Sequence, residues 1–268
     1  MHEFVSFDRE ILRCKLANIQ VLSSAALYGQ GIFTSVSISD GKPFLWERHW
    51  RRLIATAKKT RIDISKFAEI DVAETICSLI ENNEITNGRA RITFFDESAC
   101  NIWSFETGRK SSLLITTADN RKIVDNFRLT VSPYRTNTTS PLSGIKSCNY
   151  LEHLMAFDEA KARGFDEAIR LNERGEVASA CMANVFWLKD ERLHTPSLKT
   201  GCLPGTTREH ILESLDCVEV EATIDDLNSA DDIFLTSAGI GVVQVAEFAG
   251  RAMQRRPHRI LDIVPKPI

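Results

Sequence analysis

The chain has 268 residues, which is enough for two modest domains or one large one. Its 43% hydrophobic and 26% charged residues are typical of a globular protein, and a formal net charge of -3 argues against nucleic-acid binding through an overall basic surface. No apolar run reaches the length of a membrane span, and the charged N-terminus lacks the apolar core of a signal peptide, so we expect a cytoplasmic protein that does not bind a membrane.

The seven cysteines form no CxxC pair and have no zinc-type spacing to histidines. We therefore expect reduced thiols and no metal site. Cys148 and Cys181 stand beside motifs described below, where packing of a small side chain is the expected role.

The first half of the chain predicts a strand over residues 31–39, GIFTSVSIS, where apolar and small polar side chains alternate. Asp40-Gly41 predicts a hairpin turn, and the returning strand is expected over residues 42–46. The glycines that flank Gln30 let the backbone before this strand approach another group closely, although by themselves they favour a tight bend.

A helix is predicted over residues 47–59, with His49 and Arg52 three positions apart and therefore on one face. Such pairs are usually solvated, but a helical arginine that points into a cleft is a good bidentate ligand for phosphate. A second amphipathic helix is expected over residues 65–83.

The middle of the chain combines strands with a polar connection. Strands are predicted over residues 89–95, 101–106 and 113–117, the first two as a pair. Residues 119–126 are polar and are expected to link an N-terminal domain, residues 1–118, to a C-terminal domain, residues 127–268.

One lysine stands between a turn and a helix. Lys146 follows a Ser-Pro-x-Ser-Gly turn and precedes an apolar run with helical spacing that begins at Tyr150. At such a junction the side chain can reach into a cleft, and a cleft lysine with a lowered pKa is a nucleophile toward carbonyls that can form a Schiff base. A surface lysine beside a turn is the alternative.

Two later segments predict anion sites. LPGTTR at residues 203–208 precedes an apolar helix, and its small residues leave the first backbone N–H groups accessible to a phosphate. A strand over residues 232–237 runs into Ala238-Gly239, where Ser237 and backbone amides can face a ligand. An ordinary capped helix and an ordinary turn are the alternatives.

The order of these motifs resembles the class IV aminotransferase family, the pyridoxal-phosphate group of branched-chain and D-amino-acid aminotransferases and aminodeoxychorismate lyase. The segments that carry the resemblance are YGQGIFTSVSISDGKPFLWERHWRRL, IKSCNYL, GFDEAIRLNERGEVASACMANVFWL, TPSLKTGCLPGTTR and FLTSA. The resemblance implies a two-domain α/β fold of type IV, with a small N-terminal α/β domain and a larger C-terminal domain that has a barrel-like sheet. It also implies pyridoxal 5′-phosphate (PLP) between the domains, and a homodimer.

The family's cofactor-binding roles carry over to positions of this chain that match its motifs. Lys146 is expected to hold PLP as a Schiff base and to move the substrate's α-proton. The resemblance assigns the cofactor phosphate to Arg52, Thr206, Thr207, Ser237 and Ala238, the last through its N–H alone.

The resemblance also assigns residues to the cofactor ring and to the substrate. Tyr150 matches a position that in some members contacts the phenolic oxygen of the cofactor, and Tyr28, Phe33 and Arg91 match strand positions that face an amino-acid or amino-chorismate substrate.

One position departs from the family pattern. Members usually carry a glutamate five residues before the asparagine of the segment ANVF, and this chain has Ser179 there. That glutamate keeps the pyridine nitrogen protonated, and a neutral hydroxyl cannot hold the proton in the same way. Glu176 is a conceivable substitute, although strand alternation leaves its direction open.

The family contains two reactions, and this chain has features of each. Threonine in GIFTS and the segment CMANVFWL resemble aminodeoxychorismate lyase, which eliminates pyruvate to give 4-aminobenzoate. The arginine- and glycine-rich loop that lyases carry after the Arg91 strand is absent, which leaves an amino-acid aminotransferase of the branched-chain or D-amino-acid type as the alternative. A degenerate, non-catalytic family member is a third possibility.

Overall fold

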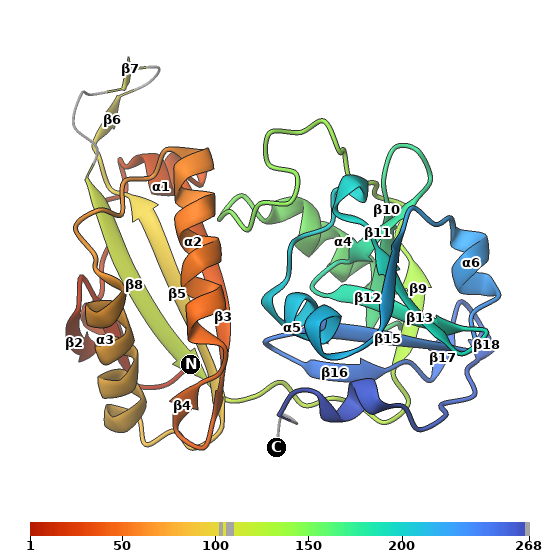
Figure 1. The fold of residues 1–268 in the computed structure, drawn as a ribbon. Coiled ribbons are helices and arrows are strands. Elements are labelled where there is room, and N and C mark those ends of the chain that lie inside the picture. Colours follow the sequence, from red (N-terminus) through yellow and green to blue (C-terminus); the bar gives the residue numbers. More distant parts are fainter. Residues whose placement is uncertain (102–103, 106–109, 266–268) are drawn as a thin grey trace. The chain divides into compact units, whose positions relative to one another are not determined.

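The computed structural model describes residues 1–101, 104–105 and 110–265, and its chain divides into two compact units. Of the residues described, the first unit contains Met1–Asn120 together with Lys146–Asn149, and the second contains Arg121–Ile145 and residues 150–265. Figure 1 shows the elements of each unit. The four residues that begin at Lys146 therefore belong with the N-terminal unit, although their neighbours in sequence belong to the other.

The first unit is built on a six-stranded antiparallel sheet with the order β2-β1-β8-β5-β3-β4. The strands are β1 (Phe4–Phe7), β2 (Glu10–Arg13), β3 (Gly31–Ser39), β4 (Lys42–Pro43), β5 (Gly88–Asp96) and β8 (Ser111–Ala118). The helices are α1 (Ser24–Tyr28), α2 (Trp46–Thr60) and α3 (Glu69–Asn82), with a 3-10 turn η1 (Cys14–Leu16).

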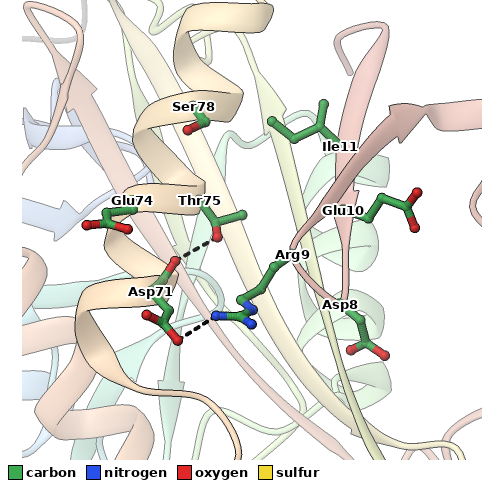
Figure 2. A pocket seen from close by; sticks show the side chains of 8 residues that line it. All are labelled: Asp8, Arg9, Glu10, Ile11, Asp71, Glu74, Thr75 and Ser78. Atoms are coloured by element: carbon green, nitrogen blue, oxygen red, sulfur yellow. Dashed lines mark hydrogen bonds and ion pairs between the residues drawn. The ribbon is translucent and has the colours of Figure 1, made fainter.

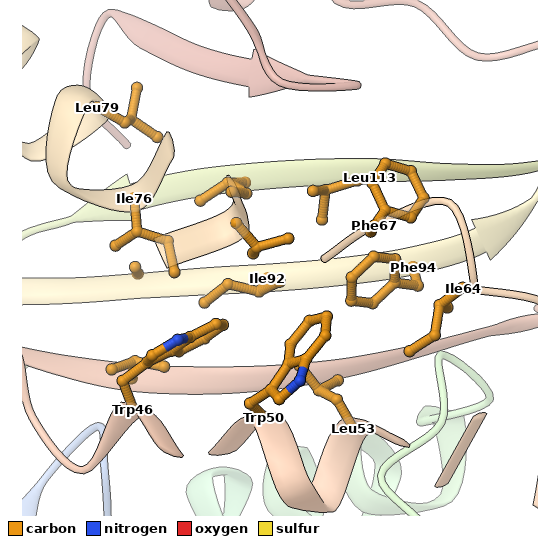
Figure 3. Packing of buried hydrophobic residues seen from close by; sticks show 14 of the residues in the cluster. Trp46, Trp50, Leu53, Ile64, Phe67, Ile76, Leu79, Ile92, Phe94 and Leu113 are labelled. Carbon is orange, nitrogen blue, oxygen red and sulfur yellow. The ribbon is translucent and has the colours of Figure 1, made fainter. Parts of the chain in front are cut away.

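One face of this sheet packs against α2 and α3 in a single apolar core. Alternation along β3 turns Ile32, Val36 and Ile38 into the core, and it turns Phe33 to the opposite face. Figure 3 shows Trp50 of α2 beside Phe94 of β5, with the two ring centroids 6.2 Å apart in an edge-on arrangement. The sheet thus keeps one face free of the core for polar chemistry.

Three expectations for this unit are corrected. The returning strand is only Lys42–Pro43, because Leu45 adopts a left-handed backbone conformation and the helix begins at Trp46. The second helix is Glu69–Asn82, shorter at its start than the expected 65–83.

The third correction concerns strand pairing. β5 pairs with β3 and β8, and not with the described residues of the expected strand 101–106. Asn101 belongs to β6 (Cys100–Asn101), which pairs with β7 (Ser104–Phe105), and residues 102–103 and 106 lie outside the described part of the chain. The pattern predicted the strands but could not choose among their partners.

The second unit contains two five-stranded sheets, β11-β10-β9-β17-β18 and β14-β13-β12-β15-β16, over the residues described. Their strands are β9 (Arg128–Val131), β10 (Glu167–Leu171), β11 (Val177–Ala180), β12 (Asn184–Lys189), β13 (Arg192–Pro196), β14 (Cys217–Val220), β15 (Asp232–Ser237), β16 (Gly241–Gln244), β17 (Glu247–Phe248) and β18 (Arg251–Ala252). The helices are α4 (Leu151–Ala162), α5 (Thr206–Ser214) and α6 (Ile224–Asn228), with 3-10 turns η2 (Leu198–Thr200) and η3 (Arg259–Asp262).

The two sheets share one apolar core. Leu129 and Ile169 come from the first sheet, and Val185, Ile233 and Leu235 come from the second. Residues of both sheets in one cluster are what a barrel-like arrangement requires, so the expected architecture of the C-terminal part is confirmed.

Candidate active site

Lys146 is fixed by backbone hydrogen bonds to β3. The Phe33 N–H donates to the Lys146 carbonyl at 3.0 Å, and the Cys148 N–H donates to the Gly31 carbonyl at 2.8 Å. A Cβ added at Gly31 would lie 2.8 Å from Cys148 Sγ, so only glycine allows this close approach. Backbone hydrogen bonds therefore hold the segment Lys146–Cys148 against the outer edge of β3.

The Phe33 ring contacts two cations. The Lys146 ammonium nitrogen lies 4.5 Å from the ring centroid, and the guanidinium carbon of Arg91 lies 3.6 Å from it. Phe33 is buried, Lys146 is half-buried and Arg91 is exposed. The predicted site residues Lys146, Phe33 and Arg91 are thus neighbours on the sheet face that points away from the core.

The environment lowers the pKa of Lys146 to about 7, from an ordinary value of 10.5. Burial is the main cause, and the positive charges of Arg52 and Arg91 act in the same direction. A substantial fraction of the side chain is therefore a neutral amine near neutral pH, which is the form that attacks a carbonyl.

Arg52 reaches this region from α2 through Thr34. Its terminal nitrogen donates to Thr34 Oγ1 at 2.7 Å, and the same oxygen lies 2.6 Å from His49 Nδ1. Thr34 and His49 are both buried. Burial lowers the pKa of His49 well below its ordinary value, and the charges of Arg52 and Lys146 add to that effect. The sequence indicated Arg52, but it gave no reason to connect Thr34 with His49.

In the second unit, the N-terminus of α5 has the features of an anion site. Thr206 and Thr207 form its first turn and are buried, and the N-cap residue is Gly205, so no side chain caps the helix. A Cβ added at Gly205 would lie 2.0 Å from Asn184 Oδ1, and Asn184 donates to the Leu203 carbonyl at 2.9 Å. Asn184 therefore braces a glycine turn that presents backbone N–H groups, a geometry suited to phosphate.

Four further predicted site residues lie at the ends of secondary-structure elements. Ser237 and Ala238 follow each other at the end of β15, half-buried, and the Gly239 N–H donates to Ser237 Oγ at 3.3 Å. Tyr150 precedes α4, and its ring stacks on His153 with centroids 4.2 Å apart. Tyr28 is 43% exposed at the end of α1.

Ser179 lies on β11 directly opposite Arg170 on β10. Arg170 is only 1% exposed, and its guanidinium donates to the Arg135 carbonyl at 3.1 Å and pairs with Glu152. Because opposed residues of an antiparallel pair share a face, this chain places an arginine beside the position of the usual glutamate. An arginine between the apolar residues of AIRLN was the only sequence signal of this feature.

Glu176 is hydrogen-bonded to residues of its own turn. Its Oε2 accepts hydrogen bonds from Arg174 at 2.6 Å and from Asn172 at 2.7 Å, and these bonds lower the pKa of its carboxyl. The structure therefore uses Glu176 to fix the turn between β10 and β11, which argues against the suggested substitution for glutamate at 179.

A separate hollow lies elsewhere in the first unit. It has a volume of about 520 Å³ and is lined by Asp8, Arg9, Glu10, Ile11, Asp71, Glu74, Thr75 and Ser78. Figure 2 shows Arg9 of the β1–β2 turn paired with Asp71 of α3 across it. None of the predicted site residues lines this hollow, so it is not the candidate active site. In the described chain, no three His, Cys, Asp or Glu side chains converge as a metal site.

A sequence model of the amino-transferase class IV family matches residues 31–248. This chain belongs to the class IV aminotransferase family. A putative branched-chain-amino-acid aminotransferase of Methanocaldococcus jannaschii is 27% identical over 258 residues, covering 90% of this chain and 86% of that protein. Aminodeoxychorismate lyase of Bacillus subtilis is 28% identical over 226 residues, covering 81% of this chain and 77% of that protein.

The fold comparison agrees with the family. The branched-chain aminotransferase of Thermoproteus uzoniensis, solved with norvaline, matches with a TM-score of 0.90 and 26% identity over 98% of this chain and 92% of that one. A putative 4-amino-4-deoxychorismate lyase of Legionella pneumophila matches with a TM-score of 0.85 and 23% identity, covering 93% of this chain and 94% of that one. The predicted mixed α/β fold of type IV is confirmed.

Membership of the class IV family confirms a PLP-dependent enzyme of the lyase or aminotransferase kind. The residues present fit PLP: Lys146 has an amine that is partly neutral near pH 7, and Gly205 opens the first turn of α5. Within the described residues, no helix has the length and apolar character needed to span a membrane.

Proposed function

We propose that this enzyme eliminates pyruvate from an amino-chorismate to give 4-aminobenzoate, as an aminodeoxychorismate lyase does. The observation that carries the proposal is Thr34, a neutral residue where aminotransferases of the family usually have glutamate, held between His49 and Arg52. With a threonine there, the site has one negative charge fewer, and the positive charge of Arg91 beside Lys146 favours a substrate that carries more than one carboxylate.

In this proposal Lys146 is the catalytic residue. PLP, when bound, supplies an aldehyde that condenses with amines and a ring that accepts electron density from the substrate. Lys146 holds the cofactor at rest, and its free amine then takes a proton from the substrate and returns one. The pKa of about 7 suits both tasks, because the amine exchanges protons readily at neutral pH.

The phosphate is assigned to residues of both units. Arg52 contributes a charged guanidinium, and Thr206 and Thr207 contribute the first turn of α5. Ser237 and Ala238 add a hydroxyl and a backbone N–H at the end of β15. We propose two domains, residues 1–118 and residues 127–268, joined by the linker 119–126.

The remaining assignments concern the substrate and the cofactor ring. Phe33 and Arg91 face the substrate, because their stacked pair lies beside Lys146. Tyr28 and Tyr150 are assigned to the substrate and to the phenolic oxygen of PLP. Ser179 is assigned to the pyridine nitrogen, where it leaves the ring a weaker electron acceptor than the usual glutamate does. Elimination tolerates that loss better than transfer of an amino group.

Amino-acid transamination is the second candidate. It is favoured by the TM-score of 0.90 to a branched-chain aminotransferase at 26% identity, and by a similar identity to the putative branched-chain enzyme. One assay separates the two. Purified enzyme should release pyruvate and 4-aminobenzoate from aminodeoxychorismate, and should convert branched-chain or D-amino acids slowly. The reverse preference would replace the lyase proposal with transamination.

A degenerate family member that binds PLP without turnover is the third reading. The lowered pKa of Lys146 argues against it, because strongly perturbed pKa values cluster at functional sites. A yellow purified protein whose absorbance band is removed by borohydride, together with turnover in either assay, excludes it.

We also propose a homodimer. Large apolar side chains are exposed in both units: Val21 and Leu22 are 75% and 63% exposed in the first, and Leu151 on α4 is 65% exposed in the second. Contact with a second subunit would remove these side chains from water, which supports an interface between subunits. Light scattering that gives the mass of one chain at full activity would contradict the proposal.

A cytoplasmic location completes the proposal. Its support is that the six cysteines described, Cys14, Cys77, Cys148, Cys181, Cys202 and Cys217, are all free thiols, which is usual in a reducing compartment.

A further inference from the structure

Thr34 is a polar residue on the core face of β3. Alternation along the strand places it with Ile32 and Val36, toward α2, and it is 0% exposed. A hydroxyl in an apolar layer costs free energy unless it is hydrogen-bonded. Helix α2 supplies both partners, His49 and Arg52, from one face. The apolar layer therefore contains one polar contact built from three side chains.

The direction of these hydrogen bonds follows from the chemistry of the groups. Arg52 can only donate, so Thr34 Oγ1 accepts at 2.7 Å. The hydroxyl keeps one hydrogen, and His49 Nδ1 at 2.6 Å accepts it when the imidazole is neutral. Burial and the neighbouring charges of Arg52 and Lys146 lower the pKa of His49, which keeps the imidazole in that form. Thr34 thus connects the histidine to the arginine.

We propose that Thr34 and His49 are positioning residues that hold the Arg52 guanidinium in the orientation needed to bind the cofactor phosphate. The proposal rests on the proposed function, because it requires Arg52 to be a phosphate ligand. An arginine side chain loses rotamer entropy when it binds a ligand. One terminal nitrogen fixed on Thr34 Oγ1 reduces this loss for Arg52.

The Thr34–His49 pair carries no charge, and this affects how Arg52 can bind phosphate. A carboxylate at position 34 would also orient Arg52, but it would form an ion pair with the guanidinium and compete with the phosphate. A hydroxyl backed by a neutral imidazole orients the arginine without neutralising it. The charge of Arg52 is therefore kept for the phosphate and for its effect on Lys146.

The test compares PLP with pyridoxal, which lacks the phosphate. Dissociation constants of both are measured by fluorescence titration on full-length protein freed of cofactor. Thr34→Val and His49→Leu should each weaken PLP binding about tenfold, which corresponds to about 1.4 kcal/mol, and change pyridoxal binding less than about twofold. The phosphorus NMR signal of bound PLP should shift in both variants.

Conservative variants separate positioning from packing. Thr34→Ser keeps the hydroxyl and His49→Asn keeps an acceptor near the Nδ1 position, so both should bind PLP within about threefold of the wild type. The double variant Thr34→Val/His49→Leu should bind PLP no more than about twofold weaker than either single variant, because both substitutions break one connection. Thr75→Val is the matched control, since Thr75 is a buried threonine of α3 that donates only to the Asp71 carbonyl.

The outcomes distinguish this inference from the function on which it rests. If Arg52→Ala weakens PLP and pyridoxal equally, Arg52 is not the phosphate ligand and the proposed function loses that residue. If Arg52→Ala is selective for PLP but Thr34→Val and His49→Leu are not, the positioning role alone is overturned. Should Thr34→Val fail to fold by circular dichroism, His49→Leu against His49→Asn decides the question from α2.

Discussion

Two charged regions of this enzyme use electrostatics in opposite ways. The first, which we call the cationic strip, consists of Lys146, Arg91 and Arg52, and there burial, together with the positive charges of the two arginines, lowers the pKa of the lysine. The second, the turn cluster of Glu173, Arg174 and Glu176 between β10 and β11, pairs opposite charges: Arg174 donates to Glu176 at 2.6 Å and to Glu173 at 3.3 Å.

The pKa shifts show the difference directly. Hydrogen bonds from Thr138 lower the pKa of Glu173 to about 2, so its charged form is favoured and the carboxylate stays an ion at every working pH. In the cationic strip the charged form of Lys146 is disfavoured, and the amine titrates near neutral pH. Burial, with like charges added, thus disfavours the charged form of Lys146, whereas hydrogen bonds from a neutral neighbour favour the charged form of Glu173 in a turn.

The largest expected effect is at the lysine. Lys146→Ala should remove covalent attachment of PLP under borohydride and reduce turnover at least about 10³-fold, within the usual range for a general acid–base group. The fold should survive, because Lys146 lies outside the apolar core. Mass spectrometry of the reduced protein measures the attachment. Lys59→Ala, an exposed lysine of α2, is the control, and a label that persists in Lys146→Ala would assign another lysine.

Arg52 tests the phosphate end of the cationic strip. Arg52→Ala should weaken PLP binding by roughly 1.5–3 kcal/mol, the usual contribution of a charge-assisted hydrogen bond. Arg51→Ala changes the exposed neighbour on the same helix and should leave the dissociation constant unchanged. Equal affinities for wild type and Arg52→Ala would remove this arginine from the site.

The cationic strip should also lower the stability of the cofactor-free protein. Between pH 7 and 10.5 the unfolded state binds more protons at Lys146 than the folded state, so the free energy of unfolding should rise with pH across this window. Lys146→Met should flatten that rise and stabilise the protein at pH 7.5 by ~1–2 kcal/mol. Denaturant unfolding at several pH values measures both. A variant that is less stable than the wild type at pH 7.5 would contradict the electrostatic account.

Ser179 combines features of both regions, because it is assigned to the cofactor and its cross-strand partner is the positively charged Arg170. If Ser179 faces the pyridine nitrogen, Ser179→Glu should change the absorbance spectrum of bound PLP and speed the half-transamination of an amino acid by ~10-fold, equivalent to ~1.4 kcal/mol. The lyase reaction should gain less. Ser179→Gln has similar size without the charge and serves as the control. A lower melting temperature without a spectral change would place Ser179 in packing, with the new carboxylate paired to Arg170.

The smallest effect is expected in the turn cluster. Glu176→Gln should leave turnover and PLP affinity unchanged and lower the free energy of unfolding by less than about 1 kcal/mol, as exposed ion pairs contribute little. Steady-state assays and chemical denaturation check the two halves of this prediction. A large loss of activity would mean that Glu176 contacts the cofactor. The turn cluster would then take part in catalysis, as the cationic strip is proposed to do.

Much of the site could be predicted because its residues stand in ordered motifs. Lys146, Arg52 and the turn before Thr206 were found from local features: a turn before a helix, a helical face, and a glycine at a helix start. His49 was noticed for its spacing to Arg52, but its contact with Thr34 crosses from α2 to β3 and has no local signature. The pairing of β5 with β8 in place of residues 101–106 was missed for the same reason, since strand alternation does not specify a partner.

The sequence by itself determined the family, the fold type and the cofactor of this protein, and it pointed to Lys146 as the lysine that we propose as catalytic, because each depends on residue types at short, fixed spacings. Only the tertiary structure decided the state of that lysine. Lys146 becomes a partly neutral amine because β3 holds its backbone, the Phe33 ring and Arg91 lie beside it, and Arg52 arrives from another element. Desolvation and Coulomb interactions act through space between residues that are distant in sequence, so no reading of one segment contains them.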